Sequence, residues 1–266
     1  MAKIIASQNT VLLIHTDFSA SLYFSNNDKL QHQYDLSTLT DLSLNASSIL
    51  DVLIPGQWVV NHLVTLPKSS QKNLLTTLPF AIEEMCVDSI DQLYIALGKQ
   101  HTDDRWQVSV IDKARWENLY CNLSLFAKQI HRIIPDYFSL PLQAHSISLY
   151  LYPRGVWFRI AENEGFSMEL SQVSAFLPEQ ENVVIYYDPQ CENQLLQLPK
   201  LAKTQIVPAM QLPSTTNTIA QSPINLLQQG YPSRIKKNVL NRHWKYCVGI
   251  FIAWLFVFFS THFLFI

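Results

Sequence analysis

The side chains that could act as acids, bases or metal ligands are spread thinly along this sequence. Glu83 and Glu84 resemble the carboxylate pair of an acid–base catalyst. Neighbouring positions of a helix point about 100° apart, however, so these two carboxylates cannot face one substrate. We therefore interpret them, together with Asp88, as an exposed acidic face that contacts solvent or a partner. The eight histidines and four cysteines show no H-x-x-x-H, H-E-x-x-H or C-x-x-C spacing, so no zinc site is predicted.

The glycine content and the net charge exclude two further classes of function. No two of the six glycines lie within six residues of each other, so neither G-x-G-x-x-G nor G-x-x-x-x-G-K-[ST] occurs. Phosphate-binding loops need such glycines to bring backbone N–H groups onto the ligand. The net charge of −2 also lacks the basic excess that is typical of nucleic-acid-binding proteins. We expect a protein that is not an enzyme and that binds no cofactor, metal or nucleic acid.

The last stretch of the chain, residues 246–266, predicts a membrane span. From Tyr246 through Trp254 to Ile266 it contains no Asp, Glu, Lys or Arg. A helix of this length rises about 31 Å, close to the roughly 30 Å hydrocarbon core of a bilayer. We therefore expect a transmembrane helix in contact with lipid. The positive-inside rule predicts that the basic residues just before the span hold the preceding chain in the cytoplasm; they are Arg234, Lys236, Lys237, Arg242 and Lys245.

The rest of the chain alternates between strand and helix patterns, which predicts an α/β fold. Residues 3–16 and 18–25 have the pattern of a hairpin. Residues 106–134 read as strand, helix and strand, with Asp112 as the helix N-cap, and predict a βαβ unit with parallel pairing. Residues 146–170 predict a three-stranded antiparallel meander. Because each half begins with a hairpin or meander and continues into βα units, the pattern indicates an internal duplication.

Two segments are expected to interrupt this pattern. A helix that begins near Gln71 contains Pro79, which predicts a kink or a break. Residues 211–223 are rich in Pro, Ser and Thr and are expected to form a polar linker.

Five motifs together resemble type II secretion system protein L. In chain order they are PGQWVVNHLVTLP, LPFAIEEMCVDSIDQLYIALG, VSVIDKARWENLY, IPDYFSLP and INLLQQGY, the last just ahead of the predicted span. Their order and spacing agree with that family from Ile54 to Ile266. The resemblance implies an actin-like fold, a duplicated ribonuclease-H-like α/β domain. It divides the chain into a cytoplasmic domain (1–210), a linker with the INLL segment and the basic run (211–245) and a transmembrane helix (246–266).

By this resemblance, the chain is expected to be a non-enzymatic scaffold in the bacterial inner membrane. Such a scaffold recruits the secretion ATPase, protein E, through the N-terminal domain of the ATPase. The resemblance also implies contacts with proteins M and F, and it leaves a homodimer open. The acidic face of Glu83, Glu84 and Asp88 is a candidate surface for the ATPase, because acidic surfaces steer basic partners.

The INLL segment carries a second implication of the resemblance. Some relatives are divided into an actin-like pilus protein and a membrane partner, and the INLL segment of the partner lies in a groove of the actin-like protein. The same segment here is therefore expected to dock onto this chain's own domain, through Ile224, Asn225, Leu226 and Leu227. The chain departs from typical members at its end, because they continue past the span into a periplasmic ferredoxin-like domain. Either that part is encoded separately or the chain is a truncated remnant.

An actin-like fold raises the question of ATP hydrolysis. Active members of that superfamily place an Asp and a Gly in a phosphate-gripping hairpin of each half. Here the first hairpin offers Asp17 with Ser19 where a glycine is expected, and the second offers Arg154 and Gly155 with no acid. Phosphoryl transfer therefore lacks its parts, and Asp17 is expected to be a turn residue. The alternative to a scaffold is a tail-anchored protein with a degenerate actin-like nucleotide site.

Overall fold

The computed structural model describes residues 9–24, 30–35, 48–67, 71–101, 104–143, 145–176, 182–196, 198, 204–209, 212, 216–228 and 231. Residue contacts divide the chain into two compact units, Met1–Arg234 and Ile235–Ile266. All the described residues belong to the first unit. They form two five-stranded sheets, one three-stranded sheet and a set of short helices.

The first five-stranded sheet has the strand order β3-β2-β1-β4-β8. Strands β1, β2 and β3 are antiparallel neighbours, whereas β4 and β8 continue the sheet in parallel. The aliphatic runs of the central strands β1 and β4 are buried on both faces, as expected for strands that are covered on both sides. The strands of this sheet are β1 (Asn9–Ile14), β2 (Ser19–Phe24), β3 (Leu30–Asp35), β4 (Ile49–Ile54) and β8 (Ile130–Pro135).

The second five-stranded sheet has the order β11-β10-β9-β12-β13. Its first three strands form the antiparallel meander that the sequence predicts, and β12 and β13 continue it in parallel. The strands are β9 (Ser146–Tyr152), β10 (Gly155–Arg159), β11 (Gly165–Met168), β12 (Asn182–Tyr187) and β13 (Thr204–Pro208).

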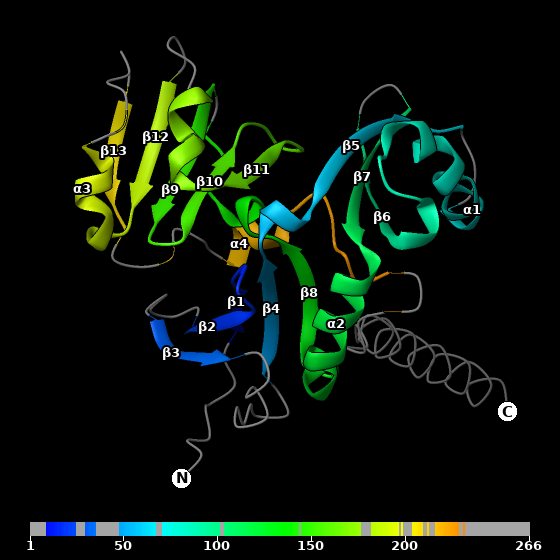
Figure 1. Cartoon of the computed structure of the whole chain (residues 1–266), viewed down its shortest axis with the longest axis horizontal. Helices are drawn as coiled ribbons and strands as arrows, with labels where there is room; N and C mark the ends of the chain where they lie inside the picture. The colour runs from blue at the N-terminus through cyan, green and yellow to red at the C-terminus, as the bar shows by residue number, and fades with distance from the viewer. Residues whose placement is uncertain are drawn as a thin grey trace, which may run out of the picture. The chain divides into compact units, whose positions relative to one another are not determined.

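The two large sheets repeat one topology. In each, an antiparallel three-stranded meander is extended by two parallel strands on the side of its first strand. Figure 1 shows one sheet as the blue strands β1 to β4 with green β8, and the other as the yellow-green strands β9 to β13. This repetition confirms the predicted internal duplication and the expected α/β class.

A three-stranded antiparallel sheet with the order β5-β7-β6 interrupts the first repeat. The prediction of a parallel βαβ unit over residues 106–134 is therefore wrong, because β7 and β8 lie in different sheets. The parallel partner of β8 is β4, and the elements between β4 and helix α2 are an insertion in that crossover. A strand's side-chain pattern does not say which strand it pairs with. The inserted strands are β5 (Val60–Thr65), β6 (Leu93–Gln100) and β7 (Arg105–Asp112).

Two helices cover the inserted sheet. Helix α1 (Gln71–Ile82) packs Leu74, Leu78 and Ile82 against one cluster of its strand side chains. The helix continues across Pro79 without the break that the sequence allowed. Helix α2 (Lys113–Leu123) begins at the predicted N-cap Asp112, whose carboxylate accepts a hydrogen bond of 2.7 Å from the backbone of Arg115.

Helices in the second half are short, and one lies in the expected linker. Helix α3 (Glu192–Leu195) follows β12, and helix α4 (Thr216–Ala220) lies within residues 211–223. Ile219 of α4 and Leu212 are buried in the main hydrophobic cluster. The described part of this segment is therefore packed onto the domain, because its apolar side chains find partners there.

Candidate functional site

The INLL segment lies against strand β8 of the first large sheet. The backbone N–H of Leu226 donates to the carbonyl of Ile133 over 2.9 Å. The Asn225 side-chain oxygen accepts from the backbone of Ile133 and of Leu227, both at 3.2 Å. Its amide group also donates to the carbonyl of His131 over 3.5 Å. The Asn225 side chain thus makes hydrogen bonds with the strand backbone like those that a peptide group makes. A leucine or alanine side chain at this position has no donor or acceptor atoms to replace them.

The same segment lies against strand β6 of the inserted sheet. The N–H of Lys99 donates to the Pro223 carbonyl over 2.8 Å. The Gln228 side chain accepts from the N–H of Leu97 at 3.1 Å and donates to the Leu97 carbonyl at 2.7 Å. The Tyr94 hydroxyl donates to the carbonyls of Leu226 and Gln228. We call residues 222–228 the docked segment, because they connect β6 and β8 by hydrogen bonds (orange trace in Figure 1).

Apolar burial adds to these hydrogen bonds. The side chains of Ile224, Leu226 and Leu227 belong to the largest buried cluster of the domain. Just beyond, Tyr231 places its ring edge-on against Tyr94 and Trp116, with ring centroids 5.5 and 5.8 Å away. Such edge-to-face contacts stabilise by about 0.5–1.5 kcal/mol each. The segment is therefore part of the core of this domain.

The tips of the β1–β2 and β9–β10 hairpins meet through side chains of their turns. Arg154 of the β9–β10 turn lies 2.6 Å from the carboxylate of Asp17 and 2.7 Å from the hydroxyl of Ser19. Asp17 also accepts from the hydroxyl and the backbone of Ser19, as a turn residue does. The hydrogen bond from the Ser19 hydroxyl and the charge of Arg154 lower the pKa of Asp17 to about 2. The Arg154 guanidinium thus balances the negative charge of this acid.

Asp136, in the IPDYFSLP motif, is a buried acid that connects the two halves. Its carboxylate accepts from the Ser167 hydroxyl of β11 at 2.5 Å and from the Tyr137 backbone at 2.7 Å. Burial raises its pKa to about 7, although these bonds and one from the Gly56 backbone oppose the rise. Gly56 has no room for a Cβ, which would collide with the Tyr137 ring. The sequence alone does not identify Asp136 as a functional residue, and the only indication is that it is the single acid of the apolar motif IPDYFSLP.

The predicted acidic face lies on the surface after helix α1. Glu83 and Glu84 form a 3₁₀ turn, and Asp88 lies in the loop that follows; all three are exposed. Beside them the structure exposes large apolar side chains that the sequence did not identify. Phe80 is 77% exposed and Val87 fully exposed, with Met85 half exposed. The helix ends at Ile82, and the turn that follows carries Met85 outward.

The predicted membrane elements lie outside the described residues. These are the span from Tyr246 through Trp254 to Ile266 and the basic run Arg234, Lys236, Lys237, Arg242 and Lys245. Among the residues that are described, no helix has the length and apolarity to cross a bilayer. Within the same ranges, no three His, Cys, Asp or Glu side chains gather closely enough to hold a metal ion.

The repeated sheets with facing hairpin tips form a duplicated α/β domain, as an actin-like fold would. Two solved structures share this fold. The cytoplasmic domain of EpsL, an inner membrane component of the type II secretion system of Vibrio cholerae, matches with a TM-score of 0.63 at 15% identity, over 85% of this chain and 100% of that chain. A PilM–PilN type IV pilus biogenesis complex matches with a TM-score of 0.50 at 9% identity, over 82% and 96%.

Sequence comparison gives the family. The model of type II secretion system protein L matches residues 20–234, so the chain belongs to that family. A type II secretion system protein L of Dickeya chrysanthemi is 31% identical over 119 residues, 44% of this chain and 29% of that protein. A second, of Pectobacterium carotovorum subsp. carotovorum, is 25% identical over 135 residues, 48% and 31% of the two chains. The chain therefore matches less than a third of the length of each of these relatives.

Proposed function

We propose that this chain is a non-enzymatic scaffold of a type II secretion system that recruits the secretion ATPase, protein E, to the bacterial inner membrane. Family membership supports the assignment to the secretion system. The observation that carries the recruitment step is the acidic and apolar surface around helix α1, formed by Phe80, Glu83, Glu84, Met85, Val87 and Asp88.

This surface has the composition of a protein interface. Large apolar side chains exposed together on a soluble domain mark interaction sites, because their exposure to water is unfavourable. The surrounding carboxylates favour a partner with a basic rim and raise its association rate. The surface belongs to helix α1 and the turn after it, and Leu74, Leu78 and Ile82 of that helix are packed into the domain. The surface is therefore held in place before a partner arrives.

The proposed membrane attachment uses the residues after the docked segment. Residues 246–266 are the transmembrane helix of the proposal, and the basic run before them faces anionic lipid on the cytoplasmic side. The docked segment supports this arrangement, because its buried side chains and hydrogen bonds fix the start of the connection to the domain. Contacts with proteins M and F, and with a second copy of the chain, belong to the same proposal.

The proposal of a scaffold without ATPase activity rests on the hairpin tips. Arg154 pairs with Asp17, and Ser19 stands in the turn where a glycine would let the backbone approach phosphate. Titration of the full-length chain with Mg-ATP tests this point. We expect no thermal stabilisation, and a saturable rise in melting temperature would support the degenerate nucleotide site.

Capture of the N-terminal domain of the secretion ATPase tests recruitment. We expect the detergent-solubilised full chain to bind that domain, and Glu83→Lys, Glu84→Lys and Asp88→Lys combined to weaken binding at least tenfold. The matched control reverses three exposed acids on other elements, Glu117→Lys, Glu169→Lys and Glu192→Lys. Equal loss in both triple variants would show a general charge effect and contradict the assignment of the surface.

A further inference from the structure

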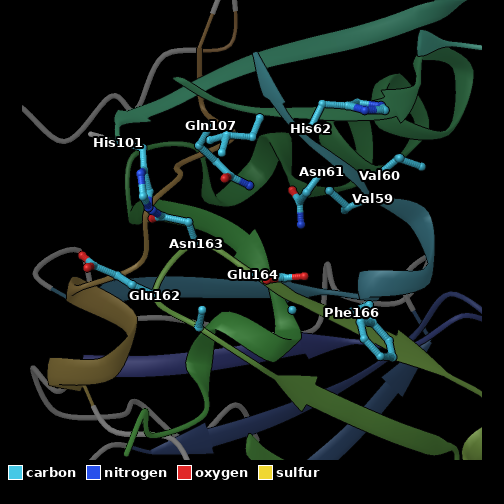
Figure 2. Close-up of a pocket in the computed structure, with 13 residues that line it drawn as sticks. Val59, Val60, Asn61, His62, His101, Gln107, Glu162, Asn163, Glu164 and Phe166 are labelled. Atoms are coloured by element: carbon cyan, nitrogen blue, oxygen red, sulfur yellow. The ribbon is translucent and has the colours of Figure 1, made fainter. Parts of the chain in front are cut away.

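A cleft outside both sites described above lies between the inserted sheet and the β10–β11 loop. Its volume is about 640 Å³. Figure 2 shows side chains from strand β5, from β7 and from the loop facing this opening. The lining residues used below are Val60, Asn61, Leu63, Gln107, Glu162 and Glu164.

Strand β5 presents an open sheet edge to this cleft. In the strand order β5-β7-β6, the described strands pair with β5 on one side only. The opposite edge of the sheet, β6, is already covered by the docked segment through Lys99 and Leu97. On β5 the large apolar side chains Val60 and Leu63 are exposed, Leu63 by 39%. An unpaired edge with exposed apolar side chains is a template for another strand.

A buried donor without a partner faces the same cleft. Gln107 lies directly opposite Leu63 in the β5–β7 register, so the two side chains share one face of the sheet. The side chain of Gln107 is only 2% exposed, and its Nε2 has no hydrogen-bond partner among the described residues. In Figure 2 its amide points into the opening, toward Asn61. Leaving such a donor unpaired costs about 1–3 kcal/mol, which a ligand carbonyl would recover.

The charge of the lining selects the ligand. Glu162 and Glu164 of the loop are exposed, and the residues that line the cleft include no lysine or arginine. Burial lowers the pKa of His62, which keeps that ring neutral near pH 7. A segment with basic side chains is therefore favoured over an acidic one.

We propose that this cleft binds an extended, basic segment of a partner protein, which adds as a fourth strand to the free edge of β5. Backbone hydrogen bonds to β5 hold the segment, a side-chain oxygen that enters the cleft accepts from Gln107 Nε2, and Lys or Arg side chains pair with Glu162 and Glu164. Apolar side chains that alternate with the basic ones lie on the opposite face of the sheet, where they contact Val60. Strand β5 has six residues, so the added strand is about 20 Å long. This proposal does not depend on which surface meets the ATPase.

A labelled peptide tests the proposal with the full-length chain in detergent. The probe is the acetylated hexapeptide Thr-Val-Lys-Val-Lys-Val, followed by fluorescence anisotropy. We expect saturable binding, with slower hydrogen exchange at the amides of β5. Two control peptides carry Glu in place of Lys, or N-methyl groups on alternate peptide nitrogens. We expect both to bind at least tenfold more weakly, and equal binding of all three peptides would overturn the proposal.

Matched variants locate the binding. Glu162→Gln with Glu164→Gln removes two exposed pairs and is expected to weaken the lysine peptide about 2- to 30-fold. Leu63→Lys on the β5 edge is expected to abolish binding. The control is Ile206→Lys on β13, the edge strand of the second large sheet, where Ile206 is 53% exposed. Loss in the control, or no loss in the β5 variant, would refute β5 as the site.

Discussion

Replacing Leu226 with alanine tests whether the docked segment stabilises the domain. Leu226 is fully buried, and its neighbours come from the largest cluster of the core. The change removes three carbons, about 2.4 kcal/mol at 0.8 kcal/mol per methylene, and the cavity adds to this loss. We expect the free energy of unfolding to fall by about 2–4 kcal/mol. For a unit of this size that corresponds to a decrease in melting temperature of roughly 5–15 °C.

Hydrogen exchange separates local undocking from global destabilisation. The amides of Leu97, Lys99 and Ile133 donate to the docked segment, so in the alanine variant they should exchange faster than the amides inside the second large sheet. The control is Leu196→Ala, where the side chain is 80% exposed and a change within about 0.5 kcal/mol is expected. If the Leu226→Ala and Leu196→Ala variants have the same melting temperature and these three amides remain protected from exchange, the segment does not stabilise the domain.

Three further predictions concern single side chains. Because the pKa of Asp136 is raised, the folded state binds more protons than the unfolded state between about pH 4 and 7, so stability falls as the pH rises through this range. In urea unfolding, the Asp136→Asn variant should not show this loss of stability. Parallel curves of stability against pH for the two proteins would contradict the prediction. Arg154→Ala breaks a solvent-exposed pair with Asp17 and should cost no more than about 1 kcal/mol, less at high salt; a larger loss would mean that the pair locks the two halves. Asp112→Ala removes the N-cap of α2 and should cost about 1 kcal/mol by the same assay, whereas Asp112→Asn should cost clearly less.

The elements that the sequence predicts well are those with local signals. Alternation and turn residues give the meander of residues 146–170, and an Asp before an amphipathic run gives the α2 N-cap. The duplication follows because both halves repeat these signals in the same order. Pairing between strands far apart in the sequence has no such signal, so the sequence wrongly predicts β7, one strand of the inserted sheet, as the first strand of a βαβ unit.

The functional residues likewise depend on contacts between distant parts of the chain, which the sequence alone does not reveal. Arg154 and Asp17 are 137 residues apart, and only the folded chain shows that the two hairpin tips meet. The exposure of Phe80 and Val87 depends on where helix α1 ends, which propensity alone does not fix. Gln107 reads as an ordinary polar residue of a strand, and its unpaired amide becomes visible only once β5 and the β10–β11 loop are in place.

The most direct test of the scaffold proposal is the location of the secretion ATPase in cells. Membrane and soluble fractions are compared in cells that lack this chain, that produce it, and that produce the triple variant Glu83→Lys, Glu84→Lys and Asp88→Lys. We predict that the ATPase moves to the inner membrane only with the unaltered chain. An ATPase that stays soluble with the chain present, or that is membrane-bound without it, would contradict the proposal.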